Sequence, residues 1–91
     1  MSELNVSGCT KLKTLLCSFN RLKNLDISHN TKLAQLICEG NYFYQLDIRK
    51  CPALIDAVKR LHRTDNGYTV TYETDTLEVR LRYNKGVELI K

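Results

Sequence analysis

The stretch Leu25–Ile48, LDISHNTKLAQLICEGNYFYQLDI, opens and closes on the same triplet, LDI, at a spacing of 21 residues. Between the two triplets lies a third, similar one, LIC at residues 36–38. A repeat at a fixed period indicates that one structural unit recurs along the chain. The period is therefore the first feature from which we predict the fold.

The 21-residue period extends to both sides of this stretch. The aligned positions are apolar or asparagine: Leu4, Leu25 and Leu46; Val6, Ile27 and Ile48; Leu12, Leu33 and Leu54; Leu15 and Leu36; Cys17 and Cys38; Asn20 and Asn41. Each unit also contains a smaller pattern, L-x-x-L-x-Φ-x-x-N-x-Φ with Φ apolar, as in residues 22–33 and 33–43. Two short strands per unit are predicted, one from each copy of the smaller pattern.

Side-chain direction follows from this pattern. Because side chains alternate along a strand, Leu25 and Ile27 are expected to point inward and Asp26 outward. The asparagine that follows each strand can bond backbone groups of its own turn and of the neighbouring unit. The predicted turn ladder consists of Asn20, Asn30 and Asn41.

The pattern L-x-x-L-x-[LIC]-x-x-N resembles a leucine-rich repeat. The nested form in residues 12–32, LKTLLCSFNRLKNLDISHNTK, is similar to the bacterial subclass called IRREKO, and the likeness covers residues 4–54. This resemblance implies a β-rich (α/β-type) leucine-rich-repeat solenoid with two short parallel strand ladders, closed by a small α+β C-terminal cap. Cys9 and Cys51 stand where the ladder otherwise has asparagine.

The period stops after Pro52. We therefore divide the chain into repeats over residues 1–52, about two and a half units, and a capping segment over residues 53–91, in a single structural domain. PALIDAVKRLHR (52–63) predicts an amphipathic helix, and YTVTYE (68–73) with LEVRLRY (77–83) predicts a hairpin. Its inward face is expected to carry Tyr68, Val70 and Tyr72, and Leu77, Val79, Leu81 and Tyr83. VELI (87–90) is a candidate last strand.

The four cysteines all occupy repeat positions, so we interpret Cys9, Cys17, Cys38 and Cys51 as buried structural thiols. Cys17 and Cys38 are expected to be neighbours in adjacent units, and a disulfide between them is the alternative. Cys9 and Cys51 are two units apart, about 10 Å, which is too far for a bond. There is no C-x-x-C motif, and His29 and His62 are not at ligand spacing, so neither a metal nor a cofactor is expected.

Two outward surfaces are candidate binding sites. The first pairs Leu16 with Ile37 on one strand ladder, flanked by Gln35 and Glu39, with Tyr42 and Tyr44 in the next turn. Apolar and aromatic side chains that are exposed together favour a protein interface. The second is the other ladder face, Asn5, Asp26 and Asp47, for which a shared proton or cation is weighed against a solvated acidic stripe.

The net charge of +4 comes from basic residues spread along the chain. Those of the capping segment are diluted by acidic neighbours, which leaves weak nucleic-acid binding as a remote alternative: Lys59, Arg60, Arg63, Arg80, Arg82 and Lys85. The N-terminus has no signal-peptide pattern and no apolar run reaches the length of a membrane span. The chain as written is expected in the cytoplasm, or outside the cell if it is a piece of a longer secreted protein.

No glycine-rich phosphate loop, nucleophile–base pair or paired-carboxylate motif stands out, so an enzyme is not expected. The sequence predicts a non-enzymatic, protein-binding module that uses outward ladder positions. The alternative is a structural or self-associating fragment of a larger repeat protein. In that case, a second copy covers the uncapped N-terminal coil and forms a homodimer.

Overall fold

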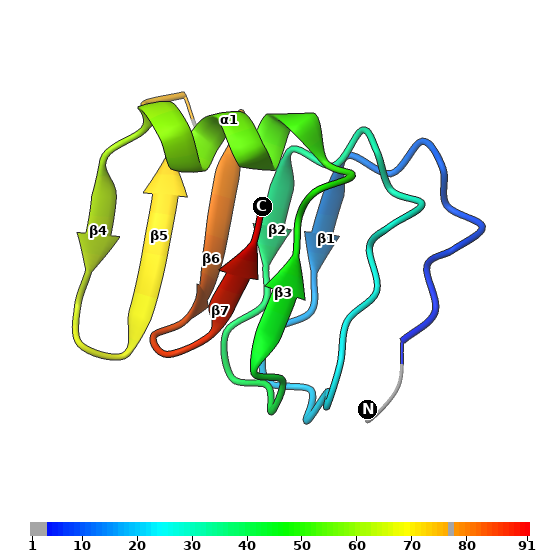
Figure 1. The fold of residues 1–91 in the computed structure, drawn as a ribbon, viewed down its shortest axis with the longest axis horizontal. Helices are drawn as coiled ribbons and strands as arrows, with labels where there is room; N and C mark the ends of the chain where they lie inside the picture. Colours follow the sequence, from blue (N-terminus) through cyan, green and yellow to red (C-terminus); the bar gives the residue numbers. More distant parts are fainter. Residues whose placement is uncertain (1–3, 77) are drawn as a thin grey trace.

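The computed structural model describes residues 4–76 and 78–91. It contains β1 (Thr14–Leu16), β2 (Gln35–Ile37), β3 (Gln45–Asp47), α1 (Pro52–Arg60), β4 (Arg63–Asp65), β5 (Thr69–Glu73), β6 (Arg80–Asn84) and β7 (Glu88–Ile90). The strands form a five-stranded sheet in the order β1-β2-β6-β5-β4 and a two-stranded sheet of β3 and β7. Figure 1 shows α1, β3 and β7 in front of the five-stranded sheet.

The predicted fold class is wrong. In place of a solenoid closed by a separate cap, the structure is a small globule with extents of 30 × 29 × 21 Å. The segment predicted as a cap supplies β6, which pairs in parallel with β2, so both parts of the chain share one mixed sheet. Between repeats, β1 pairs in parallel with β2, but the second predicted ladder does not form, because residues 25–27 are not a strand and β3 pairs with β7 instead.

Successive units nevertheless contact each other through equivalent positions. Asn41 Nδ2 donates to the carbonyl groups of Cys17 and Cys38, at 2.9 and 3.0 Å. Its Oδ1 accepts the backbone N–H groups of Asn20 and Leu22, at 3.1 and 2.9 Å. One buried amide thus joins two turns that the sequence places 21 residues apart.

Asn30 makes the same kind of contact in the other half of the unit. Its Nδ2 donates to the carbonyl groups of Val6 and Cys9, at 2.9 and 3.0 Å. Its Oδ1 is buried without a hydrogen-bond partner in the described part of the chain. The side chain of Asn20, by contrast, bonds only within its own turn among the described residues, through Nδ2 to the Ser18 carbonyl at 3.1 Å.

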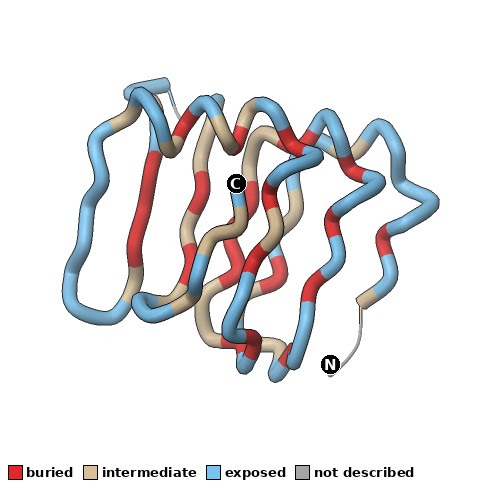
Figure 2. Tube along the Cα trace, viewed as in Figure 1, coloured by how far each residue is buried: buried red, intermediate tan, exposed pale blue. Residues whose placement is uncertain are grey.

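The core lies between the two sheets and α1. Figure 2 shows buried residues at intervals along the strands and the helix, with exposed residues in most of the turns. The largest fully buried aliphatic side chains come from the repeats and from the C-terminal segment alike: Leu22, Ile27, Leu33, Leu36, Leu46, Ile48, Leu54, Val70 and Leu81. Burial of this shared apolar surface is the main stabilising contribution to the fold.

The C-terminal elements follow ordinary local rules. Pro52 lies in the first turn of α1, where its missing N–H costs nothing, and the helix buries Leu54 and Ala57. β5 and β6 form the antiparallel hairpin, with Val70, Tyr72, Leu81 and Tyr83 buried. Tyr68, predicted on the same inward face, is 82% exposed, because it lies in the turn before β5. The prediction for Leu77 lies outside the described residues.

No helix in residues 4–76 or 78–91 has the length and apolar character that crossing a membrane requires.

Candidate functional site

The outer face of the five-stranded sheet is the main candidate site, and we call it the open face. Its side chains alternate along the strands with those that face the core, and within residues 4–76 and 78–91 no helix or second sheet covers it (Figure 1). Strand register places its residues in two cross-strand rows: Leu16, Ile37, Arg82, Thr71 and Thr64 in one, Thr14, Gln35, Arg80 and Glu73 in the other. Neighbours within a row are about 4.8 Å apart, since that is the spacing of strands in a sheet.

The apolar end of the open face consists of Leu16 and Ile37. Leu16, on β1, is 69% exposed. Ile37 was predicted to be exposed, and that prediction is wrong: it is only 8% exposed, because Leu16 and Arg82 flank it in the row. The exposed apolar surface is therefore mainly Leu16, with the buried Ile37 beside it in the row.

Gln35 and Glu39 flank this end, both partly exposed. Glu39 Oε1 accepts a hydrogen bond from Ser18 Oγ at 2.9 Å. Its Oε2 is buried and has no partner within the described residues. Glu39 is therefore held in place by the turn after β1.

Tyr42 and Tyr44 do not join Leu16. Two adjoining hollows, of about 510 and 430 Å³, lie between their segment and the turn between β6 and β7; Tyr44, Phe43 and Gly86 line both, and Tyr42 lines the second. The Glu88 backbone N–H donates to the Tyr44 carbonyl at 2.8 Å, which fixes the two segments side by side. With Tyr42 59% and Tyr44 84% exposed, this groove is a second surface, separate from the open face.

Phe19 is an exposed aromatic residue that the sequence interpretation missed. It is 77% exposed, and its φ of 58° lies in the left-handed region that few residues other than glycine adopt. Its equivalent 21 residues later is Gly40, with a φ of 78°, and the Phe19 ring packs directly over it. The only sequence signal was that Gly40 aligned with Phe19, which indicates a shared left-handed turn position.

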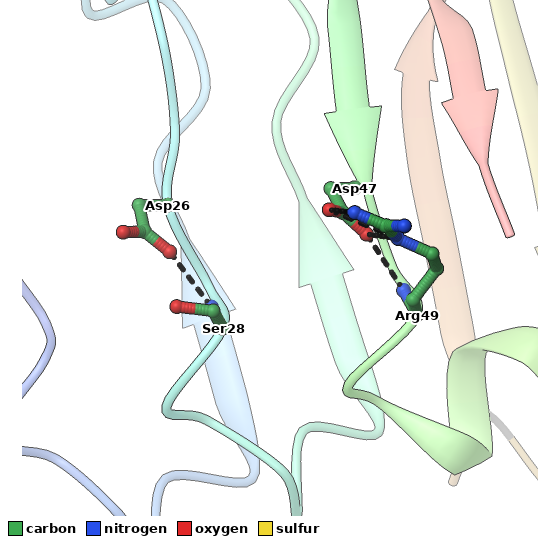
Figure 3. Close-up of polar contacts among 4 residues, drawn as sticks. All are labelled: Asp26, Ser28, Asp47 and Arg49. Carbon is green, nitrogen blue, oxygen red and sulfur yellow. Dashed lines mark hydrogen bonds and ion pairs between the residues drawn. The ribbon is translucent and has the colours of Figure 1, made fainter.

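The second predicted surface is a set of local turns. Oδ1 of Asn5, of Asp26 and of Asp47 accepts the backbone N–H two residues on, at 3.0, 2.9 and 3.0 Å. Arg49 also pairs with Asp47, at 2.8 Å between Nη2 and Oδ2 (Figure 3). These bonds occupy the side chains within their own turns.

The carboxylates of this surface are acidic, not proton-sharing. Hydrogen bonds from the Arg49 side chain and backbone lower the pKa of Asp47 to about 2. Hydrogen bonds from Ser28 lower the pKa of Asp26, and they outweigh the repulsion from Asp47. Both groups are ionised at neutral pH, which favours the solvated acidic stripe over a shared proton.

Three of the four cysteines are buried, as predicted: Cys17, Cys38 and Cys51. Burial raises the pKa of Cys17 and of Cys51 to about 11 and that of Cys38 well above its usual range. Cys9 is exposed, so its assignment as a buried thiol is wrong. The Cys51 thiol donates to the carbonyl groups of Ile27 and Asn30, at 3.7 and 3.3 Å, in the preceding unit. All four are free thiols.

Most basic residues of the C-terminal segment are paired with carboxylates, so they do not form a continuous positively charged surface. Arg60 pairs with Asp56, Arg63 and Lys85 with Asp65, and Arg80 with Glu73. Tyr72 and Tyr83 are buried, so they offer no face on which a base can stack. Within the described residues, no group of three or more His, Cys, Asp or Glu side chains is placed to hold a metal ion.

No protein-family model, curated protein or solved structure matches this chain.

Proposed function

We propose that the protein is a non-enzymatic binding module whose open face contacts a partner protein. The observation that supports this proposal is Leu16, a 69% exposed leucine beside the partly exposed side chains of one uncovered sheet face. A rigid sheet with an apolar residue and a polar rim has the composition typical of a protein interface. The 21-residue repeat also leads us to propose kinship with bacterial leucine-rich repeat proteins.

The test is a comparison of two exposed-residue variants. Leu16→Asp puts a charge on the open face, while Tyr68→Asp does the same in the turn before β5, at 82% exposure. Neither is expected to change the free energy of unfolding by more than about 0.5 kcal/mol, since both side chains are exposed. Proteins captured from a lysate by the wild type should be lost with Leu16→Asp and retained with Tyr68→Asp. Equal retention by all three would sink the proposal.

Self-association is the second candidate, and the free edge of β1 favours it. The Lys13 carbonyl accepts a hydrogen bond from Gln35 N–H, and the Cys17 N–H donates to the Ile37 carbonyl, both at 2.9 Å. Lys13 and Cys17, on either side of β1, therefore direct these backbone groups toward β2. Because N–H and C=O directions alternate along a strand, those of Thr14 and Leu16 point away from β2. An unpaired strand edge of this kind favours pairing with another chain.

The geometry restricts how two copies would pair. Suppose that the β1 strands of two copies pair antiparallel, with Thr14 of one copy opposite Leu16 of the other. Every N–H and C=O group of Thr14 and Leu16 that points away from β2 then forms a hydrogen bond with the second copy. The two-fold axis then passes beside Leu15, as an isologous dimer requires. Thr14→Pro removes one outward N–H without removing a bond to β2, and proline is tolerated on edge strands. Sedimentation equilibrium should show a wild-type dimer and a Thr14→Pro monomer, and a monomeric wild type rejects this candidate.

A further inference from the structure

A second feature of the open face lies next to Ile37. Arg82, on β6, is partly exposed, and its Nε donates to Thr71 Oγ1 at 3.1 Å. Within the described residues its other guanidinium N–H groups make no hydrogen bond, and no carboxylate lies within ion-pair distance of them. A partly desolvated cation without a counter-charge is costly and gains from binding an anion.

The neighbouring arginine shows the contrast. Arg80 lies 3.1 Å from Glu73, measured from Nε to Oε2, at an angle that makes an ion pair but no hydrogen bond. This pair is nearly neutral as a unit. Arg82 is thus the residue of the open face whose positive charge has no partner among the described residues.

A hollow lies beside Arg82. It has a volume of about 120 Å³ and is lined by hydroxyl, amide and charged groups of β4, β5, β6 and the turn between β4 and β5: Thr64, Asn66, Thr69, Thr71, Glu73 and Arg82. That volume holds about four water molecules. It accommodates a carboxylate and its methylene group.

From this geometry we infer that Arg82 and the threonines beside it form a subsite for a carboxylate of the partner protein, an aspartate or glutamate side chain. A guanidinium presents parallel N–H groups that match the two oxygens of a carboxylate. Because Arg80 neutralises Glu73 at the rim, Arg82 leaves one uncompensated positive charge at the hollow, which matches the single charge of a carboxylate better than the larger charge of a phosphate. The inference rests on the proposed binding function of the open face, which it extends from Leu16 to Arg82.

The register also sets a spacing for the partner. Leu16 and Arg82 are two strand spacings apart in one row, about 10 Å. A polyproline II segment has three residues per turn and rises about 3.1 Å per residue, so its residues i and i+3 lie on one side, about 9 Å apart. An apolar residue followed three positions later by an acidic one fits both subsites.

The probe is therefore the peptide acetyl-Leu-Pro-Pro-Glu-amide, with acetyl-Leu-Pro-Pro-Gln-amide as its uncharged control. Binding is followed by nitrogen–proton NMR of the Arg82 Nε–H group and by the methyl signals of Leu16 and Ile37. We expect the glutamate peptide to shift all three residues, and the glutamine peptide to shift the methyl signals alone. Arg82→Gln should weaken the glutamate peptide at least about tenfold, as expected when a charge-assisted hydrogen bond is lost.

Matched variants separate the subsite from net charge and from misfolding. Arg63→Gln removes the same charge from β4 and should leave the affinity unchanged. Glu73→Gln should tighten binding, because it leaves the positive charge of Arg80 without its counter-charge beside the hollow. Arg82→Lys retains the charge without the paired N–H groups and should give an intermediate affinity.

Several results overturn the inference. If the glutamate peptide shifts the methyl signals but not Arg82, the carboxylate subsite is wrong while the open face remains a binding surface. If neither peptide shifts any of these signals, both the subsite and its apolar neighbour fail. If a single-stranded oligonucleotide shifts Arg82 at a lower concentration than the glutamate peptide does, the ligand is a nucleic acid and the assignment to a protein carboxylate is wrong.

Discussion

Asn41 offers the sharpest test of how the repeat holds the fold together. Its side chain is 6% exposed and makes four hydrogen bonds to backbone groups: two to carbonyls and two from N–H groups. Asn41→Ala removes all four and leaves their backbone partners in a buried site. At about 1 kcal/mol for each bond, the free energy of unfolding should fall by about 4 kcal/mol. A domain of this size has about 5–14 kcal/mol in total, so the loss is large.

Two other asparagines of the predicted turn ladder serve as matched controls. Asn30 makes only two such bonds, because its Oδ1 has no partner among the described residues, so Asn30→Ala should cost about 2 kcal/mol. Asn20 makes a single side-chain bond within its own turn, and Asn20→Ala should cost about 1 kcal/mol. The sequence pattern treats the three residues alike, and the structure ranks them.

The measurement is urea unfolding followed by far-ultraviolet circular dichroism. The three variants should lower the midpoint in the order Asn41, Asn30, Asn20, with the slope of free energy against urea unchanged. If Asn41→Ala costs no more than Asn30→Ala, the four bonds of Asn41 do not contribute as counted. A changed slope would show instead that the compactness of one of the states had altered.

Three further predictions concern the turns and the thiols. Gly40→Ala should destabilise the fold more than Gly67→Ala, as measured by urea unfolding. Both glycines have a positive φ, so alanine at either position adds a backbone strain of about 1 kcal/mol. A Cβ at Gly40 also overlaps the Phe19 ring, whereas a Cβ at Gly67 meets open space. Equal losses for the two would show that the Phe19 contact is not formed. Asp47 has a folded pKa of about 2, below its unfolded value, so its contribution is present above about pH 4 and is lost as the pH falls toward 2. In the Arg49→Gln variant the pKa of Asp47, measured by NMR titration, should rise toward its ordinary range. An unchanged pKa in this variant would show that the Arg49 side chain does not lower it. With iodoacetamide, Cys9 should react fast and the buried Cys17, Cys38 and Cys51 slowly, as followed by mass spectrometry. Four equally fast thiols would mean that the core opens readily.

Much of the local structure could be predicted from the sequence, because it depends on neighbours in the chain. The alternation of apolar residues determines that Leu36 and Cys38 are buried, since a strand presents opposite faces at successive residues. Pro52 and the spacing of the apolar residues after it determine a helix there. The period of 21 places Asn41 one unit after Asn20, and their hydrogen bond joins those two units.

Tertiary structure decided which strands became neighbours. Alternating residues specify a buried face but not a partner, so the sequence did not show that β6 joins β2 or that β7 joins β3. That choice replaced the expected solenoid with a compact globule, and it set the candidate site. Arg82 was assigned to a separate basic cap, yet the register brings it beside Ile37, which it helps to bury. The position of Arg82 on the open face therefore depends on the pairing of β2 with β6, whose residues are more than 40 positions apart, and no local pattern encodes that pairing.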